Sequence, residues 1–473
     1  MKNFSIKALA KIIEAESVRG EPQGTITGVS IDSRTTQAGN CFFAIPGDNF
    51  DGHDYVADAF AKGAACAVVG KDEKSTGHCV LRVDDTIKAL GELAGEYRRR
   101  MNFRVVAITG SVGKTTTRQI TYHVLSRYFR VFQSPKNFNN NIGLPLTLLG
   151  ADEEEIVIAE LGSNHPGEIA YLAGIAQPDV AIVTNVYPAH LDGFGNLKTI
   201  VQEKLSISEG LRQGGIFIIN ADFDGLIDVC QAETIEFTTF GISGAGDIQA
   251  RDISYGSSNS RFTVDSTEVT VPLPGRGNVE NALAAWVICS RFGISIDDFA
   301  HDLKSLSECA GIAMRAQLMQ IGTLTVLNDC YNANPASMKN ALDILANLDS
   351  SEERRRVFIC GDMAELGRQS RRLHTELGTR IAQAKVQLFL AVGKFAKVAA
   401  DAAKKTAEHD LQTKCFQDTL SACNKLEEFI KDYDVILVKG SRTSKLEAVT
   451  EKLKDLFLPM QLPVADHGLR GAR

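Results

Sequence analysis

Seven short, nearly uninterrupted apolar runs recur along the chain, and each passes into glycine or a polar residue. Strands that are buried on both faces of a parallel sheet show this pattern, because neither face needs polar side chains. Helical periodicity alternates with the runs, for example over 115–127 and 278–292. The pattern therefore predicts a doubly wound α/β architecture. The runs are RVVAITG (104–110), EIVIAELG (155–162), DVAIVTNV (179–186), GIFIINAD (215–222), RVFICGD (356–362), QLFLAVG (387–393) and DVILVKG (434–440).

Changes in this pattern along the 473 residues predict three domains, each long enough for a core of its own. Residues 1–84 hold short strands and a glycine-rich segment, and we expect a small mixed α/β domain. Residues 85–312 predict a central doubly wound α/β domain with a phosphate-binding loop (P-loop). Residues 313–473 repeat the alternation and predict a C-terminal Rossmann-like α/β domain. The alternating, Ser-, Gly- and Thr-rich stretch 242–273 indicates a β-hairpin, and 461–473 is expected to be a loose tail.

Composition narrows the class of protein. An apolar content of 44% and a charged content of 23% are typical of soluble globular proteins, and the net charge of −7 argues against a nucleic-acid partner. We expect the arginine triplets 98–100 and 354–356 to lie at a solvated helix end and in a loop. Ten scattered cysteines without C-x-x-C spacing indicate reduced, mostly buried thiols in the cytoplasm. Neither a signal peptide nor an apolar stretch of about 20 residues is present, so no membrane insertion is expected.

Candidate chemistry begins where the first apolar run ends, at TGSVGKTT (109–116). The common P-loop pattern G-x-x-x-x-G-K-[ST] would need glycine at position 108, which is Ile108. A G-x-G-K-T-T segment between a strand and a helix still predicts phosphate binding. Its glycines let backbone N–H groups turn inward, and the helix N-terminus favours anions. Lys114 would then reach the outer phosphates, and the Thr115 hydroxyl would ligate Mg²⁺.

Polar residues also follow the next strands. Glu160 ends EIVIAE, where a carboxylate lies beside the ligand crevice of an open α/β sheet, so it is the candidate metal partner of the P-loop. His190 lies in the loop after the next strand. A loop histidine is usually a surface residue, but this position one strand on from Glu160 favours a metal or phosphate role. By composition alone, Lys204 on the following helix reads as a solvated lysine.

Two further polar segments leave alternatives open. The asparagines of 137–141 fit simple turn chemistry and an amide-lined ligand site about equally well. Residues 329–334 place polar groups after a strand and so indicate a crevice. Ser337 fits a cap of the following helix.

Nine blocks in this order resemble the Mur ligases, the ATP-dependent amide ligases of peptidoglycan precursor synthesis. The blocks are DSRTTQAGNCFFAIPGDNFDGHDY, TGSVGKTTT, KNFNNNIGLPLTLL, AELGSNHPGEI, TNVYPAHLDGFG, GRGNVENALAA, YNANPASM, GDMAELG and VKGSR. The family's P-loop is the short form T-G-[ST]-x-G-K-T-[ST], which accounts for the missing glycine. Two positions depart from the family pattern. Gly277 replaces a frequent histidine before the adenine motif, and Lys136 replaces a glycine before the first asparagine of 137–141.

The resemblance implies a set of site residues. Lys114, Glu160, His190 and Lys204 would be catalytic. One Mg²⁺ would be held by Thr115 and Glu160, and a second by His190, bridged by Lys204 as a carbamate that supplies an anionic oxygen ligand. ATP would be bound by Thr109, Gly110, Ser111, Val112, Gly113, Lys114, Thr115, Thr116, Asn278, Asn281, Arg315, Asp329 and Tyr331. The UDP-sugar substrate and the polar cleft would involve Ser33, Arg34, Thr35, Gly47, Asp51, Gly52, His53, Asn137, Asn140, Asn332 and Asn334.

The resemblance also implies the reaction. ATP would phosphorylate the terminal carboxylate of UDP-N-acetylmuramoyl-tripeptide, and D-alanyl-D-alanine would attack the acyl phosphate, in a cytoplasmic, monomeric ligase of cell-wall biogenesis whose domains close on ATP. The alternatives are another Mur-type or folylpolyglutamate-type amide ligase, or a nucleotide-switched binding module without catalysis. The D-N-P-R motif of diaminopimelate-adding ligases is absent from the sequence, and folylpolyglutamate synthases would not need the UDP-type first domain.

Overall fold

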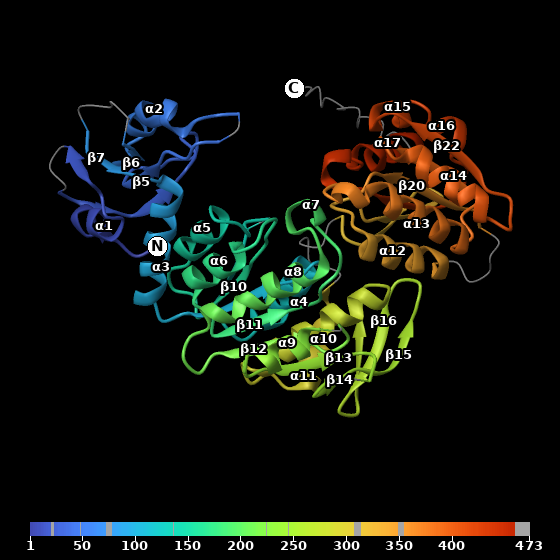
Figure 1. Cartoon of the computed structure of the whole chain (residues 1–473), viewed down its shortest axis with the longest axis horizontal. Helices are drawn as coiled ribbons and strands as arrows, with labels where there is room; N and C mark the ends of the chain where they lie inside the picture. Colours follow the sequence, from blue (N-terminus) through green and yellow to red (C-terminus); the bar gives the residue numbers. More distant parts are fainter. Residues whose placement is uncertain are drawn as a thin grey trace, which may run out of the picture. The chain divides into compact units, whose positions relative to one another are not determined.

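A computed structural model describes residues 1–19, 23–47, 49–71, 78–135, 137–223, 225–244, 246–306, 314–348 and 354–458 (Figure 1). The chain divides into two compact units. The first comprises Met1–Ser254, Ser260–Pro272 and Arg276–Gly311, and the second comprises Tyr255–Asn259, Leu273–Gly275 and Ile312–Arg473. The predicted first and central domains therefore share one unit. Lys136, the predicted boundary at 312/313 and the predicted tail 461–473 lie outside the described residues.

The N-terminal part of the first unit holds a five-stranded mixed sheet in the order β2-β7-β6-β5-β4. Only β2 runs antiparallel to its neighbour, β7. A short antiparallel pair, β1-β3, accompanies this sheet. The strands are β1 (Phe4–Ser5), β2 (Ser17–Arg19), β3 (Thr25–Ile26), β4 (Gly28–Ser30), β5 (Asn40–Phe43), β6 (Cys66–Gly70) and β7 (Val80–Val83), and the helices are α1 (Ile6–Ile12), α2 (Val56–Ala61) and α3 (Thr86–Arg100).

A seven-stranded parallel sheet forms the centre of the first unit, in the order β14-β13-β12-β11-β8-β10-β9. The chain leaves β8 for β9 and β10 on one side and then returns to β11 on the other. The carboxyl end of β8 is therefore a topological switch point, where open α/β sheets bind ligands. The strands are β8 (Arg104–Thr109), β9 (Val131–Gln133), β10 (Ile156–Glu160), β11 (Val180–Val183), β12 (Ile216–Asn220), β13 (Thr238–Gly241) and β14 (Ile248–Gln249).

Helices of this part form two packed groups against the sheet. Helix α4 packs with α10 and α11, while α3 packs with α5 and α6. The bounds are α4 (Lys114–Leu125), α5 (Gly143–Gly150), α6 (Glu168–Ala176), α7 (Leu191–Phe194), α8 (Leu197–Leu205), α9 (Leu226–Ala232), α10 (Arg276–Ser290) and α11 (Ile296–Leu303). Two predicted helices, 115–127 and 278–292, are thus confirmed within two residues at each end.

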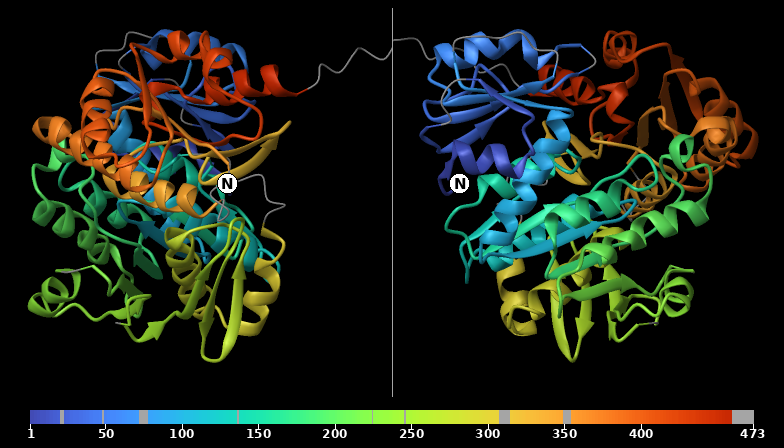
Figure 2. Two further views of the ribbon diagram at one scale, coloured as in Figure 1. Left: turned by 90° about the vertical axis from the view of Figure 1, so that its right-hand side faces the viewer. Right: turned by 60° about the vertical axis from the view of Figure 1, so that its left-hand side comes forward.

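The predicted hairpin at 242–273 is confirmed only in its second half. Strands β15 (Arg251–Tyr255), β16 (Ser260–Val264) and β17 (Thr267–Val271) form a separate three-stranded sheet, seen as yellow-green arrows in Figure 2. The first half instead adds β14 to the edge of the parallel sheet. Alternation alone could not separate these two outcomes, because it predicts a strand without predicting its partner.

The second unit holds a six-stranded sheet in the order β18-β19-β23-β20-β21-β22, parallel except for β18. The strands are β18 (Gln317–Ile321), β19 (Leu324–Asn328), β20 (Arg356–Gly361), β21 (Leu388–Val392), β22 (Gln412–Phe416) and β23 (Val435–Lys439). The helices are α12 (Pro335–Asn347), α13 (Ser370–Gln383), α14 (Ala396–Thr406), α15 (Thr419–Cys423), α16 (Leu426–Phe429) and α17 (Glu447–Phe457). All seven predicted strands are therefore observed.

The arginine triplets lie at the end of α3 and at the start of β20, as expected, but the expected solvation is wrong for Arg98 and Arg356. Arg98 is buried, and its guanidinium donates to the carbonyls of Ala176 and Phe103 and to Asp179 at 2.7 Å. Arg356 is buried as well. Most cysteines in the described ranges are buried free thiols, as expected. None of the helices in those ranges combines the length and hydropathy that a membrane span requires.

Candidate active site

The P-loop lies at the switch point, between β8 and α4, and its glycines are required by close packing. Gly110 has φ +147° and Gly113 has φ +84°. A Cβ on Gly110 would lie 2.1 Å from Thr184 Oγ1, and one on Gly113 would lie 2.1 Å from Asn281 Oδ1. Side chains at either position would displace the loop, so both glycines have a physical reason to be there.

Residues after β11 hold this loop in place. The Ser111 amide donates to the Asn185 carbonyl at 3.1 Å, and the Val112 amide donates to Asn185 Oδ1 at 2.9 Å. Asn185 Nδ2 and the Thr184 hydroxyl both donate to the Val112 carbonyl. These two amides are thus directed at Asn185. The first-turn amides of α4 have no acceptor within the helix, and a helix N-terminus favours anions.

Lys114, Thr115 and Glu160 come together at the adjacent ends of β8 and β10. Lys114 Nζ donates to the Gly110 carbonyl at 2.5 Å. The Thr115 hydroxyl donates to Glu160 Oε2 at 3.2 Å. Glu160 is 2% exposed, and its other oxygen, Oε1, lies 3.1 Å from Arg118 Nε. The structure therefore brings together the three residues that the sequence placed on phosphate and metal.

The donor set fits Mg²⁺. Hydroxyl and carboxylate oxygens are hard ligands, and Mg²⁺ in nucleotide sites takes one or two protein carboxylates and completes its shell with phosphates and water. Thr115 and Glu160 supply two such oxygens side by side. Across the described ranges, no three His, Cys, Asp or Glu side chains are grouped to hold a metal by themselves.

Lys204 is buried rather than solvated. It is 3% exposed, its Nζ donates to Ser163 Oγ at 2.8 Å, and the Phe194 ring lies below it at 5.7 Å. Burial, together with the charge of Lys114, lowers the pKa of Lys204 to about 7.

His190 precedes α7 in a left-handed conformation with φ +50°, which is uncommon for a residue with a side chain. Such strain is typical of functional sites.

Asn278 and Asn281 lie on α10, where this helix packs against α4. Both side chains are buried. The Thr117 hydroxyl donates to Asn281 Oδ1 at 3.4 Å, and Asn281 Nδ2 lies 3.4 Å from Asn278 Oδ1. Asn281 therefore lies directly against Gly113 of the P-loop. The structure places this predicted nucleotide residue beside the P-loop.

The asparagine-rich segment uses part of its chemistry for its own turn. Asn140 Oδ1 accepts from the amides of Gly143 at 2.8 Å and Ile142 at 3.3 Å, at the start of α5. The Asn139 carbonyl accepts from Gly162, just after Glu160. Asn137 is exposed. The hydrogen bonds of Asn140 Oδ1 thus belong to the turn. The contact between Asn139 and Gly162 places the segment beside the end of β10.

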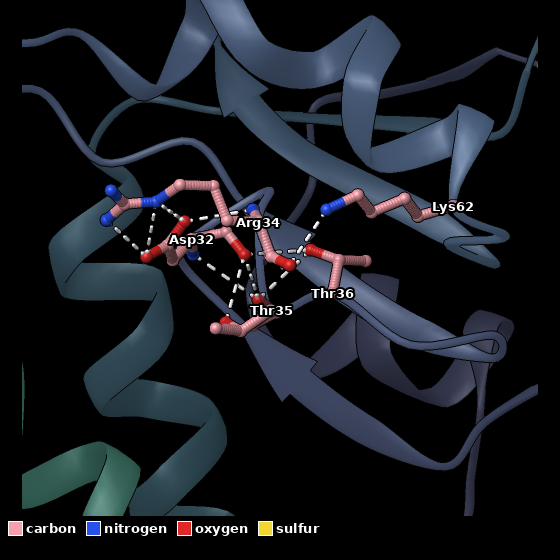
Figure 3. A network of polar contacts seen from close by, with 6 residues as sticks. Asp32, Arg34, Thr35, Thr36 and Lys62 are labelled. Atoms are coloured by element: carbon pink, nitrogen blue, oxygen red, sulfur yellow. Dashed lines mark hydrogen bonds and ion pairs between the residues drawn. The ribbon is translucent and has the colours of Figure 1, made fainter.

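A hydrogen-bonded turn at residues 32–36, which includes Ser33 in the sequence, presents Arg34 and Thr35 in the N-terminal part (Figure 3). Asp32 accepts from the Arg34 amide at 2.9 Å and pairs with its guanidinium at 2.8 Å, and the Lys62 ammonium donates to the Arg34 carbonyl. Hydrogen bonds and charge from Arg34 lower the pKa of Asp32 to about 2. Ser33 is buried, whereas the Arg34 side chain is 86% exposed.

Pro46 pairs with Asp51, next to the predicted substrate residues Gly52 and His53. The Gly52 amide donates to the Ile45 carbonyl at 3.0 Å. His53 Nε2 accepts from the Gly70 amide at 2.9 Å, so its Nδ1 carries the proton and donates to Asp51 Oδ1 at 2.6 Å. The His53 ring thus links Asp51 of the loop to Gly70 of β6. Gly47 precedes position 48, which lies outside the described residues.

In the second unit, a buried lysine pairs with the carboxylate of Asp329, which the sequence assigned to nucleotide binding. Lys439 is 1% exposed, and its Nζ donates to Asp329 Oδ2 at 2.5 Å and to the Asn332 carbonyl at 3.0 Å. The Tyr331 ring has the Arg315 guanidinium 4.1 Å from its centroid and that of Arg442 6.0 Å away. The cluster joins Arg315, Asp329 and Tyr331, as expected, to Lys439 and Arg442 of VKGSR.

Asn334 and Asn332 have local partners. Asn334 caps α12: its Oδ1 accepts from the Ser337 amide at 2.9 Å, and Ser337 Oγ accepts from the Asn334 amide, which makes a reciprocal capping box. The predicted cap role of Ser337 is therefore shared with Asn334. Asn332 Oδ1 accepts from the Ala333 amide at 2.9 Å.

Sequence reasoning missed four residues of these clusters: Asn185, Arg118, Lys439 and Arg442. Three of them stand inside blocks that the sequence already singled out (TNVYPAHLDGFG, for Asn185, and VKGSR, for Lys439 and Arg442). Arg118 directly follows TGSVGKTTT. A polar residue directly after an apolar strand was the available signal for Asn185 and Lys439, because strand ends meet at the crevice.

Comparison with known proteins covers nearly the whole chain. Family models described as "Mur ligase family, catalytic domain", "Mur ligase middle domain" and "Mur ligase, glutamate ligase domain" match residues 25–98, 108–289 and 314–442. A relative from Bacillus subtilis (strain 168), named UDP-N-acetylmuramoyl-tripeptide--D-alanyl-D-alanine ligase, is 33% identical over 95% of this chain and 98% of its own length.

Solved structures agree. A crystal structure of MurF from Acinetobacter baumannii is similar with a TM-score of 0.87 and 30% identity, covering 96% of this chain and 99% of that one. MurF ligase from Thermotoga maritima, solved in complex with ADP, has a TM-score of 0.77 and 27% identity, covering 90% and 97%. The expected α/β fold is confirmed. With three family models matched in order and a full-length relative at this identity, the chain belongs to the Mur ligase family.

Proposed function

We propose that this chain is an ATP-dependent carboxylate–amine ligase that joins D-alanyl-D-alanine to UDP-N-acetylmuramoyl-tripeptide, yielding ADP and phosphate. The observation that carries the proposal is the convergence of Lys114, Thr115 and Glu160 at the switch point. This convergence occurs in a chain that aligns almost end to end with a ligase of that name. A binding module without catalysis would have no need of two metal sites, the second of which would involve His190 and Lys204.

The chemistry explains these residues. A carboxylate is a poor acyl donor, so its oxygen first attacks the γ-phosphorus, and ADP leaves. The amine then attacks the acyl carbon, phosphate leaves with that oxygen, and the amine gives up a proton. Lys114 offsets the repulsion between the two anions, and the α4 amides hold the phosphates. Mg²⁺, held by Thr115 and Glu160, would supply additional charge neutralisation at the phosphates.

A second Mg²⁺ would be held by His190 and by Lys204 as a carbamate. Only a neutral amine adds CO₂, and a lysine with its ordinary pKa is almost entirely charged at neutral pH. The lowered pKa of Lys204, about 7, leaves much of the amine neutral near pH 7. Ser163 lies within hydrogen-bond distance of Nζ and would hold the modified group in place.

The domains follow the same assignment. Residues 1–84 would bind the UDP-sugar through the turn at 32–36 and the loop at 47–53, and 85–312 would bind ATP. Residues 313–473 would bind the dipeptide and bring Arg315, Asp329 and Tyr331 to the nucleotide. We further propose that the enzyme works as a monomer in the cytoplasm, where UDP-activated precursors and ATP are present.

Phosphate release tests the proposal. With ATP, Mg²⁺ and UDP-N-acetylmuramoyl-tripeptide, release should depend on D-alanyl-D-alanine and should match formation of the amide product. Release that ignores the dipeptide would favour a nucleotide switch, and release driven by glutamate or diaminopimelate instead would assign the chain to a different amide ligase of the family.

A further inference from the structure

A buried arginine lies beside the proposed metal site, and the proposed reaction assigns it no role. Arg118 is on α4, one turn beyond Lys114, and is 2% exposed. Charged side chains are almost never fully buried unless paired. Its partners are therefore informative, and they come from two other segments of the first unit.

The first partner is Glu160 at the end of β10. Arg118 Nε lies 3.1 Å from Glu160 Oε1, and both side chains are 3% exposed. The contact is an ion pair whose geometry falls short of a directed hydrogen bond. The opposite oxygen, Oε2, accepts from the Thr115 hydroxyl. The carboxylate is thus held at one oxygen by Arg118 and at the other by Thr115.

The second partner is Ser134, at the start of the asparagine-rich segment. Arg118 Nη1 donates to the Ser134 carbonyl, and the Glu160 amide donates to Ser134 Oγ at 3.2 Å. One guanidinium therefore joins three segments: the P-loop helix, the strand that ends in Glu160 and the loop that leads to α5. A planar, forked donor suits this task, whereas a lysine ammonium is a single point charge.

We propose that Arg118 is a positioning residue for the metal site: it fixes the Glu160 carboxylate so that Oε2 faces Thr115. This inference rests on the proposed role of Glu160 as a metal ligand. Buried ion pairs contribute little net stability compared with well-packed apolar residues, and this pair, unlike that of Arg98, includes a proposed metal ligand. Groups that orient metal ligands typically change metal affinity about 10–100-fold when removed.

Metal binding to Arg118→Met tests the inference without relying on activity. Mn²⁺, bound in the presence of ADP and followed by electron paramagnetic resonance, replaces Mg²⁺ as the probe. We expect Mn²⁺ affinity to fall about 10–100-fold, and we expect Arg118→Lys to recover part of the loss. UDP-N-acetylmuramoyl-tripeptide binding, measured by calorimetry, should be unchanged or only slightly weaker.

Arg98→Met is the matched control. Arg98 is an equally buried arginine that contacts Asp179 and main-chain carbonyls. It lies at the amino-terminal ends of the strands of the same sheet, where β11 begins, whereas Glu160 lies at their carboxyl ends. This variant should lose stability and keep its Mn²⁺ affinity. If Arg118→Met binds Mn²⁺ as wild type does, or if Arg98→Met loses the same affinity, the inference is overturned.

Should Arg118→Met fail to fold, Arg118→Lys decides. Weaker Mn²⁺ binding at an unchanged melting temperature supports the positioning role, and wild-type binding contradicts it. Ligation by the wild-type protein in the same preparation reports on the proposed function separately, so the two can fail independently.

Discussion

The carbamate proposed for Lys204 is the least ordinary chemistry assigned to a single residue of the site. If its amine forms a carbamate that ligates metal, Lys204→Ala should lower ligation at least about tenfold, because a metal ligand is lost. A short carboxylic acid such as acetate should partly restore the rate by taking the place of the carbamate oxygens. Lys198→Ala, an exposed lysine on the same helix, is the control and should not respond to the acid. Full activity of Lys204→Ala, with or without acetate, would rule out the carbamate.

His374, in the second unit, should make stability depend on pH. Burial lowers its pKa below the ordinary value of 6.5, although Asp362 Oδ1 lies 3.8 Å away. Its Nε2 accepts from the Met363 amide at 3.1 Å, its Nδ1 contacts the Ser370 carbonyl at 2.7 Å, and its ring stacks on Phe395. The neutral ring fits both polar contacts, whereas a protonated Nε2 could not accept from Met363.

The sign follows from proton binding. Below pH 6.5 the unfolded chain takes up a proton at this histidine before the folded chain does, so stability falls as pH falls through the lowered pKa and is retained above 6.5. Thermal melting of His374→Gln between pH 5 and 8 should therefore show a melting temperature that depends less on pH than that of wild type. Its overall stability should be lower. His301→Gln, at an exposed position, should keep the wild-type slope. An unchanged slope in His374→Gln would contradict this account.

Residue by residue, the sequence predicted the side chains at strand ends better than their supports. Lys114, Thr115 and Glu160 could be placed together because the carboxyl ends of parallel strands share one edge of the sheet. Asn185 follows an apolar run and was missed despite that signal. Arg118 could not be placed, since its partners lie far along the chain and its helical position alone does not identify it. The burial of Lys204 was missed for the same reason.

At the level of elements, α12 begins with a capping box that the structure assigns to Asn334 and Ser337. Asn334→Ala should destabilise the protein by about 1 kcal/mol, because a cap hydrogen bond is lost. A shift of about 2–4 °C in the melting temperature would register this loss. Asn334→Asp should keep the cap and the melting temperature. Wild-type stability of Asn334→Ala would contradict the capping role. Loss of ligation in Asn334→Asp at full stability would instead support the predicted contact with substrate.

The elements themselves were largely predictable. Continuous apolar runs identified seven strands of the two large sheets, because such strands are buried on both faces. The strands of the N-terminal part were harder to predict, since six of these seven are only two to four residues long and leave little pattern to detect. The stretch 242–273 was interpreted as one hairpin, yet β14 pairs with the parallel sheet, because pairing is decided by tertiary contacts.

At the scale of the whole molecule, this chain uses ATP to activate a carboxylate for amide formation. The claim joins two independent lines, the phosphate and metal residues at the switch point and the membership in the Mur ligase family over nearly the full length. Each of these two observations alone would be compatible with other functions. A P-loop by itself indicates only nucleotide binding, and a shared fold does not by itself identify a substrate.

Isotope transfer tests this claim most directly. UDP-N-acetylmuramoyl-tripeptide labelled with ¹⁸O in its terminal carboxylate is incubated with ATP, Mg²⁺, D-alanyl-D-alanine and the enzyme, and the released phosphate is analysed by mass spectrometry. An acyl phosphate requires one carboxylate oxygen to leave with phosphate, so each phosphate should carry one ¹⁸O, and Lys114→Ala should yield neither product nor label. Phosphate released without ¹⁸O would show that ATP is hydrolysed by water and would contradict the account.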